Sequence, residues 1–283
     1  MDHGKMSSLL FYKNVAPLNV ESHLNLKMRA PKNLEFCADT TVVPILASEF
    51  IEIGKSMPIA FLRLEDQSLL PVALVGLPDQ KNVFLTADYK WKTPYIPAFV
   101  RRYPFIFAQS GPEELTLCVD MNYEGLNQED GDLLFEQKEN GVEPGQLVKS
   151  ALEMTAEYQR QHITTTQFAK RLEELGLLID STAKANLPEG EPYELTGFLV
   201  VDREKLMNIS EELIRGMFLS GELELIYAHL HSLGNILELL RKNTESAAVQ
   251  KPAEENMVSS AIKKGTVLGK KILTKRAPAK DKA

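Results

Sequence analysis

The chain has 283 residues, of which 44% are hydrophobic and 25% charged, a composition typical of a globular protein with a substantial core. Its net charge of −7 is unevenly distributed, because residues 257–283 contain eight basic residues and one acidic residue, which leaves −14 for residues 1–256. An acidic body with a basic tail argues against specific nucleic-acid binding.

The N-terminal region has no basic segment followed by an apolar run and a small-residue cleavage site, so we expect no signal peptide. No window of 18 apolar residues occurs, so we expect no membrane span and a cytoplasmic location. Residues 1–7 are expected to be flexible, and Met6 is an alternative start to Met1. The two cysteines, Cys37 and Cys118, are too few for a disulfide framework and are expected to be buried thiols.

Short apolar runs separated by turn residues dominate the first half of the chain. Residues 42–57 are compatible with a short helix, and strands are expected at 59–66, 70–77, 82–88, 105–110 and 115–121. No helix-length connection separates these strands, which predicts an antiparallel meander. Residues 122–145 are polar and contain four glycines, so we expect a long loop there, anchored by the apolar residues 133–135.

From residue 146 the apolar period becomes helical. We expect one helix over 146–161 and a second that begins at Thr164, where Gln167 has capping-box spacing and Gly176 provides a left-handed stop. Residues 196–202 are expected to return to the sheet as a strand, and Asp202 or Ser210 to open further helices.

The last ordered element is expected over residues 222–243. An apolar stripe with Leu230 at its centre predicts that this helix is buried against the sheet. Residues 244–283 are rich in Ala, Glu and Lys, and we expect them to form a disordered basic tail.

Few motifs in the chain carry chemistry. His229 and His231 are two apart on the expected last helix and point in different directions, so we expect one buried and one solvated ring and no metal chelation. No glycine-rich phosphate loop and no nucleophile motif is present. We therefore expect no cofactor, no metal and no catalytic residues.

The stretch TPYIPAFVRRYPFIF, residues 93–107, is the densest in prolines and aromatic rings. Pro97 can open a short helix and Pro104 can end it, which places Phe99 and Tyr103 on one face. We expect Phe99, Tyr103 and Phe105 to be structural. Trp91, Tyr95, Arg101 and Arg102 are the candidate binding residues, because exposed guanidinium groups beside aromatic rings suit a carboxylate or a peptide.

A simpler interpretation of this stretch stays open. The aromatic rings would all belong to the core, and the arginines would pair with local acids such as Asp88 or Asp120.

Several segments, in order, resemble the bacterial SapC family: YIPAFVRRYPFIF, LTLCVDM, TTTQFAKRLEELGLL, LTGFLVVDREKL and GELELIYAHLHSLGNILELL. The resemblance covers about residues 8–243 and leaves the tail outside. The family is named after a genetic locus for a surface array protein and its export. Members are often encoded near proteins similar to flavin-dependent tryptophan halogenases and near TonB-dependent receptors, which implies an accessory or peptide-handling role. The family supplies no established catalytic residues.

We therefore expect a single α+β domain, residues 8–243, with an antiparallel meander and C-terminal helices packed on it. The leading hypothesis is a non-enzymatic accessory protein that binds a protein or peptide. The alternatives are an enzyme of peptide or small-molecule modification and a surface-layer or export component. The sequence leaves the partner, the oligomeric state and the role of the tail open.

Overall fold

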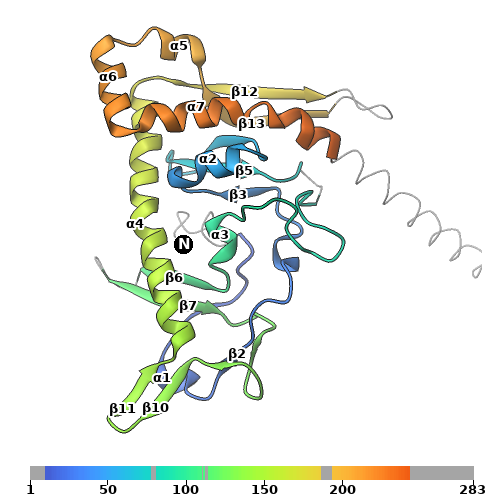
Figure 1. Cartoon of the computed structure of the whole chain (residues 1–283), viewed down its shortest axis with the longest axis vertical. Coiled ribbons are helices and arrows are strands. Elements are labelled where there is room, and N and C mark those ends of the chain that lie inside the picture. Colours follow the sequence, from blue (N-terminus) through green and yellow to red (C-terminus); the bar gives the residue numbers. More distant parts are fainter. Residues whose placement is uncertain (1–9, 78–80, 110, 112–113, 186–192, 243–283) are drawn as a thin grey trace, which may run out of the picture.

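The computed structural model describes residues 10–77, 81–109, 111, 114–185 and 193–242. Its sheets are antiparallel, and helices follow them toward the C-terminus, so the predicted α+β fold is confirmed. The flexible N-terminus predicted for residues 1–7 and the basic tail predicted for 244–283 lie outside the described residues. Figure 1 shows an elongated molecule with one long helix, α4, running along its side.

The larger sheet has five strands in the order β12-β13-β4-β5-β3. Their bounds are β3 Val42–Pro44, β4 Ile59–Arg63, β5 Leu69–Leu74, β12 Leu178–Ala185 and β13 Tyr193–Val201. The strands predicted at 59–66, 70–77 and 196–202 are present, and the last returns to the sheet by pairing Leu199 with Phe61. Strand β12, at the sheet edge, was not predicted.

The β4–β5 hairpin is closed by a turn that its sequence favours. Asp66 accepts hydrogen bonds from the amide and the hydroxyl of Ser68, and Gln67 has a positive φ of 67°. Ile59, Ala60 and Phe61 are all fully buried, which requires cover on both faces of the strand. Helices α2 (Phe50–Gly54), α4 (Gln146–Glu174) and α7 (Glu222–Ser232) all contact this sheet.

The predicted meander is divided between two sheets. Strands β6 (Phe105–Gln109) and β7 (Leu115–Asp120) form a separate three-stranded sheet with β1 (Val15–Pro17), in the order β1-β7-β6. The strand predicted at 82–88 is wrong, because this segment makes turns and a single bridge between Leu85 and Trp91.

The loop predicted for 122–145 contains more regular structure than expected. It holds β8 (Leu126–Asn127), β9 (Asp132–Leu133) and the hairpin of β10 (Phe135–Lys138) with β11 (Gly141–Pro144), and β2 (Lys27–Met28) lies between β8 and β9. The predicted apolar anchor is present in Leu134 and Phe135, which are buried, whereas Leu133 is exposed.

Helix α4 is a single helix of 29 residues, so the prediction of two helices with a cap at Thr164 is wrong. Thr165 and Thr166 instead donate to the carbonyls of Gln161 and His162, four residues earlier in the same helix. The predicted stop at Gly176 is confirmed, with a φ of 64°. Because α4 contacts both β5 and β6, it joins the two sheets (Figure 1).

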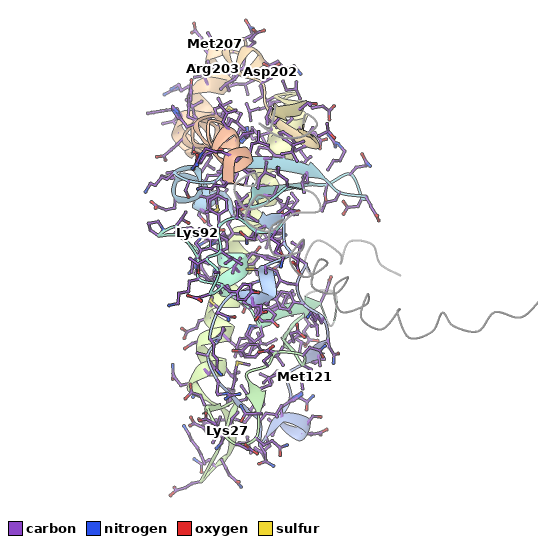
Figure 2. All side chains as sticks on the ribbon, turned by 90° about the vertical axis from the view of Figure 1, so that its right-hand side faces the viewer. Lys27, Lys92, Met121, Asp202, Arg203 and Met207 are labelled. Atoms are coloured by element: carbon purple, nitrogen blue, oxygen red, sulfur yellow. The ribbon has the colours of Figure 1, made fainter. Side chains whose placement is uncertain are left out.

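The remaining helices are short, and the predicted caps at Asp202 and Ser210 are confirmed by their hydrogen bonds to Glu204 and Leu213. Their bounds are α1 Val20–His23, α3 Ala98–Arg101, α5 Arg203–Met207 and α6 Glu211–Ser220, with 3₁₀ turns at Glu35–Cys37 and Ala47–Glu49. In Figure 2, Met207, Arg203 and Asp202 mark one end of the molecule, and Lys27 lies toward the other.

The last helix packs against the sheet as predicted, and Ile226 and Leu240 of its apolar stripe are buried, but the centre of the buried face is not Leu230. The segment 222–243 is interrupted at residues 233–234, and helical structure resumes over 235–242. Leu230 is only half-buried, while Leu237 is 73% exposed. The fully buried positions of α7 are Ile226, His229 and Ser232.

Candidate functional site

The stretch 93–107 forms a short turn of helix, α3, that is capped from a distant part of the chain. Pro97 is the N-cap residue and has no side-chain acceptor. The carboxylate of Glu49 supplies one, since its Oε1 accepts from the amide of Ala98 at 2.7 Å. Pro104 follows the turn through a cis peptide bond with Tyr103.

Glu49 is a buried carboxyl that joins its own turn to the stretch 93–107 through three hydrogen bonds. Besides Ala98, it accepts from the amide of Leu46 at 2.8 Å and from the hydroxyl of Tyr95 at 2.8 Å. Burial raises the pKa of this carboxyl, while the three hydrogen bonds and the nearby Arg101 partly oppose that rise. No pattern around Glu49 in the sequence marked it as a partner of the turn.

Three of the predicted binding residues are brought together in one partly exposed group. The indole nitrogen of Trp91 donates to Thr93 at 2.8 Å, and the Thr93 hydroxyl donates to the carbonyl of Tyr95 at 3.2 Å. Arg101 is exposed, and its guanidinium carbon lies 5.6 Å from the centroid of the Tyr95 ring. We call Trp91, Thr93, Tyr95 and Arg101 the Arg101 surface; Lys92, which follows Trp91, is labelled at mid-height in Figure 2.

The orientation of Arg101 is fixed by the turn itself. Its Nε donates to the carbonyl of Ile96 at 2.9 Å, and Nη2 makes a long contact of 3.4 Å with the hydroxyl of Tyr95. Burial and the adjacent Glu49 carboxyl raise the pKa of Tyr95 to about 12, so its hydroxyl stays protonated and donates to Glu49. Nη1 makes no hydrogen bond with the residues that the structure describes, which leaves that nitrogen available to a ligand.

The expectation that Arg102 also lies on the exposed rim was wrong. This residue is only 5% exposed, and its guanidinium carbon lies 4.3 Å from the ring centroid of Phe99 and 4.2 Å from that of Tyr158. Its Nε has no hydrogen-bond partner among the described residues. Aromatic faces take the place of a carboxylate around this cation, and a binding role for Arg102 would require this packing to open.

The aromatic residues expected to be structural are buried. Phe99, Tyr103 and Phe105 are all less than 10% exposed, and Phe99 and Tyr103 both pack against Phe11, at centroid distances of 5.3 and 5.6 Å. Phe36 stacks on Tyr103 at 4.1 Å. One face of the turn therefore lies in an aromatic cluster formed with the N-terminal segment.

Asp120 holds that N-terminal segment in place. This fully buried carboxylate accepts from the amides of Lys13, Asn14 and Asn122 at 2.9 to 3.0 Å, and the hydroxyl of Tyr103 lies 3.3 Å away. The open alternative in which Asp120 pairs with an arginine is not what the structure shows. Backbone amides satisfy the aspartate instead.

A concave pocket of about 690 Å³ lies on the other side of the same aromatic cluster. Its walls come from residues 10–13, 29–41 and 122–125, and Tyr103 is the one residue of the stretch 93–107 in its lining. The Arg101 surface contributes nothing to this pocket. Two separate candidate sites therefore flank the turn of α3.

Polar side chains on α7 and just beyond it form hydrogen bonds with backbone groups of the sheet and of α2. His229 Nε2 accepts from the amide of Val201 at 3.0 Å, Ser232 accepts from the amide of Ile59 at 2.9 Å, and Asn235, just beyond the helix, donates to the carbonyl of Gly54 at 2.8 Å. The prediction of one buried and one solvated histidine is confirmed, since His229 is fully buried and His231 is exposed.

Metal-binding clusters and membrane-spanning helices were sought among the described residues alone. There, no group of three or more His, Cys, Asp or Glu side chains could hold a metal ion, and no helix is long and apolar enough to cross a bilayer. Cys37 and Cys118 are both buried and free.

A family model described as SapC matches residues 18–239, well over half of the chain. The chain belongs to the SapC family. The match includes α3, the Arg101 surface and the α7 segment, and it leaves the pocket residues Leu10, Phe11 and Lys13 outside. No curated protein and no solved structure matches the chain.

Proposed function

We propose that this SapC-family chain is a non-enzymatic accessory protein that binds a protein or peptide partner through a carboxylate held at the Arg101 surface. The observation that carries the proposal is the state of Arg101. Its guanidinium is exposed, is oriented by the hydrogen bond to Ile96, and keeps Nη1 free of a partner in the described part of the chain. A preoriented guanidinium loses little freedom when it binds a planar carboxylate.

The neighbouring rings support a partner larger than a lone carboxylate. Tyr95 lies beside Arg101, and Trp91 is linked to Tyr95 through Thr93. Both rings are half-buried, so each keeps part of its surface accessible to a bound side chain. Aromatic residues with arginine are the combination that most often dominates the energy of protein interfaces.

Trp91 is the single tryptophan of the chain, so its fluorescence reports on this surface. The probe is acetyl-Phe-Glu-amide, with acetyl-Phe-Gln-amide as its uncharged match. We expect saturable changes in Trp91 emission and a preference of up to about fivefold for the Glu peptide, the range of an exposed ion pair. Arg101→Ala should remove the preference.

Arg160→Ala is the matched control, because Arg160 is an exposed arginine on α4, far along the chain from this surface. It should retain the preference. Equal binding of both peptides to the unaltered chain would refute the carboxylate site. Chemical conversion of the probe, detected by mass spectrometry, would favour the alternative of a peptide-modifying enzyme.

The location and the remaining partner predictions stay proposals. We propose a cytoplasmic location and no specific nucleic-acid binding. Fractionation of cells with an antibody to the full chain tests the first, and recovery of the chain from the cell surface would favour the surface-layer or export alternative. Electrophoretic mobility shift of the full chain on mixed DNA and RNA tests the second.

A further inference from the structure

The pocket beside Tyr103 is surrounded by charges of both signs that do not pair with one another. Lys13, Arg29 and Lys32 contribute positive charge, and three acids, Glu35, Asp39 and Glu124, contribute negative charge. None of these six side chains forms an ion pair with any residue that the structure describes. Because these opposite charges line one pocket without pairing, each remains available to a ligand.

The wall of the pocket is preformed. The hydroxyl of Tyr123 donates to the carbonyl of Arg29 at 2.7 Å, which fixes the ring against residues 29–31. Gly125 makes room for this arrangement, because a Cβ at that position would lie 2.4 Å from the Tyr123 ring and 2.6 Å from the Arg29 carbonyl. A ligand therefore meets a fixed surface and pays little to order it.

A positively charged and a negatively charged side chain both lie near Tyr123 in the pocket wall. Burial raises the pKa of the Tyr123 phenol to about 12. Of the two nearby charges, Arg29 lowers this pKa and Glu124 raises it. Both side chains thus lie close enough to Tyr123 to act on it. Behind them, the stacked rings of Phe36 and Tyr103 form an apolar floor.

A volume of about 690 Å³ lies within the range of sites for small ligands, about 300–1,000 Å³. A ligand with a single charge would be attracted by the lining charges of one sign and repelled by those of the other. From the charges, the floor and the fixed wall we infer that this pocket binds a short zwitterionic peptide, with an apolar side chain on the aromatic floor. This site is separate from the Arg101 surface and does not depend on the function proposed for it.

The test titrates the full chain with the tripeptide Ala-Phe-Ala in four forms: both termini free, N-acetylated, C-amidated, and blocked at both ends. Amide signals of Thr41, Asn122 and Gly125 report binding by NMR. We expect the free peptide to bind most tightly and each blocked terminus to weaken binding about two- to fivefold. The doubly blocked peptide acetyl-Lys-Phe-Glu-amide distinguishes an internal charged segment from free termini as the source of the charges.

Paired variants assign the two ends of the peptide. Glu35→Gln with Asp39→Asn should abolish the penalty for N-acetylation, and Arg29→Ala with Lys32→Ala should abolish the penalty for C-amidation. Arg160→Ala with Lys170→Ala, on the exposed face of α4, should change neither. Equal affinity for all four forms, or penalties that persist in both pocket variants, would overturn the inference. Signal changes confined to Trp91, Tyr95 and Arg101 would also overturn it while supporting the Arg101 surface.

Discussion

His229 should make the stability of the fold sensitive to mild acid. Burial lowers the pKa of this histidine from 6.5 to about 4, and the backbone of Ile59 opposes that shift only in part. Nε2 accepts the amide hydrogen of Val201, so the neutral ring is the form that fits the folded protein. Protonation would destroy this acceptor and place a charge in a fully buried site.

The direction of the pH effect follows from proton binding. Between pH 6.5 and 4 the unfolded chain is protonated at His229 and the folded chain is not, so acid favours unfolding. The stability contributed by the neutral ring is fully present above pH 6.5 and is lost as the pH falls toward 4. Since one pKa unit corresponds to about 1.4 kcal/mol, the full loss is about 3 kcal/mol, of which about 2 kcal/mol should appear by pH 5.

Urea denaturation at pH 7 and pH 5 measures this loss, with His229→Gln as the test variant. Glutamine can present an oxygen acceptor to Val201 but does not titrate. It gives up the ring contact with Phe61, whose centroid lies 5.2 Å away, so we expect it to be less stable at pH 7. Its further loss of stability between pH 7 and pH 5 should be smaller than that of the unaltered chain by about 2 kcal/mol.

His231→Gln is the matched control, because His231 is exposed on the same helix and should leave the pH dependence unchanged. If the unaltered chain and His229→Gln lose stability in parallel, the reasoning is refuted. Should His229→Gln fail to fold, an NMR titration of the unaltered chain still decides. A His229 ring that gains its proton near pH 6.5 would contradict the argument.

Two further predictions concern packing. Arg102→Met should destabilise the fold less than Arg102→Lys, because methionine fills the aromatic cage without a buried charge, while lysine brings a strongly hydrated ammonium. Thermal denaturation measures the two melting temperatures, and a lower value for Arg102→Met than for Arg102→Lys would argue for a specific role of the charge. Ile226→Ala should lower the free energy of unfolding by about 2–5 kcal/mol, because this residue is fully buried, and Leu237→Ala by less than about 0.5 kcal/mol, because this residue is 73% exposed. Equal losses of unfolding free energy in urea denaturation would show that the buried positions of this C-terminal helical segment are misassigned.

Local sequence rules predicted the elements whose cause is local. The hairpin between β4 and β5, the helix stop at Gly176 and the caps at Asp202 and Ser210 each depend on residues within a few positions of one another. These were all correct because nothing distant in the chain overrides them.

The rules failed where a distant segment decides the outcome. The run of threonines at 164–166 has the composition of a helix start, yet Thr165 lies inside α4, where its hydroxyl accepts from the amide of Ala47 at 2.8 Å. That contact joins α4 to the turn before α2 across more than a hundred residues and cannot be inferred from spacing. The same holds for α7, whose buried face includes His229 and Ser232 because both bind backbone amides of the sheet.

The candidate site shows the same division. The sequence predicted Trp91, Tyr95 and Arg101 as neighbours because they lie within eleven positions. The structure places Tyr95 between Arg101 and Glu49, which is more than forty positions away, and links Trp91 to Tyr95 through Thr93. Arg102 was misplaced because its aromatic cage draws on Tyr158 of α4, which no local pattern connects with it. The pocket was missed entirely, since its walls come from three separate segments and from Tyr103, which belongs to a fourth.

The consecutive residues Arg101, Arg102 and Tyr103 lie in three different environments. Arg101 ends α3 and Arg102 is its C-cap, so their side chains point about 100° apart: Arg101 is exposed beside Tyr95, and Arg102 enters the aromatic cage. Tyr103 follows outside the helix and lines the pocket. Each environment is built by other parts of the chain: Glu49 caps the turn, Tyr158 closes the cage, and Asp120 binds the segment that carries the pocket residue Lys13. Because Tyr12 contacts both Arg102 and Tyr103, those two environments share packing, and only a substitution at the exposed Arg101 should leave the other two unchanged in the folded protein.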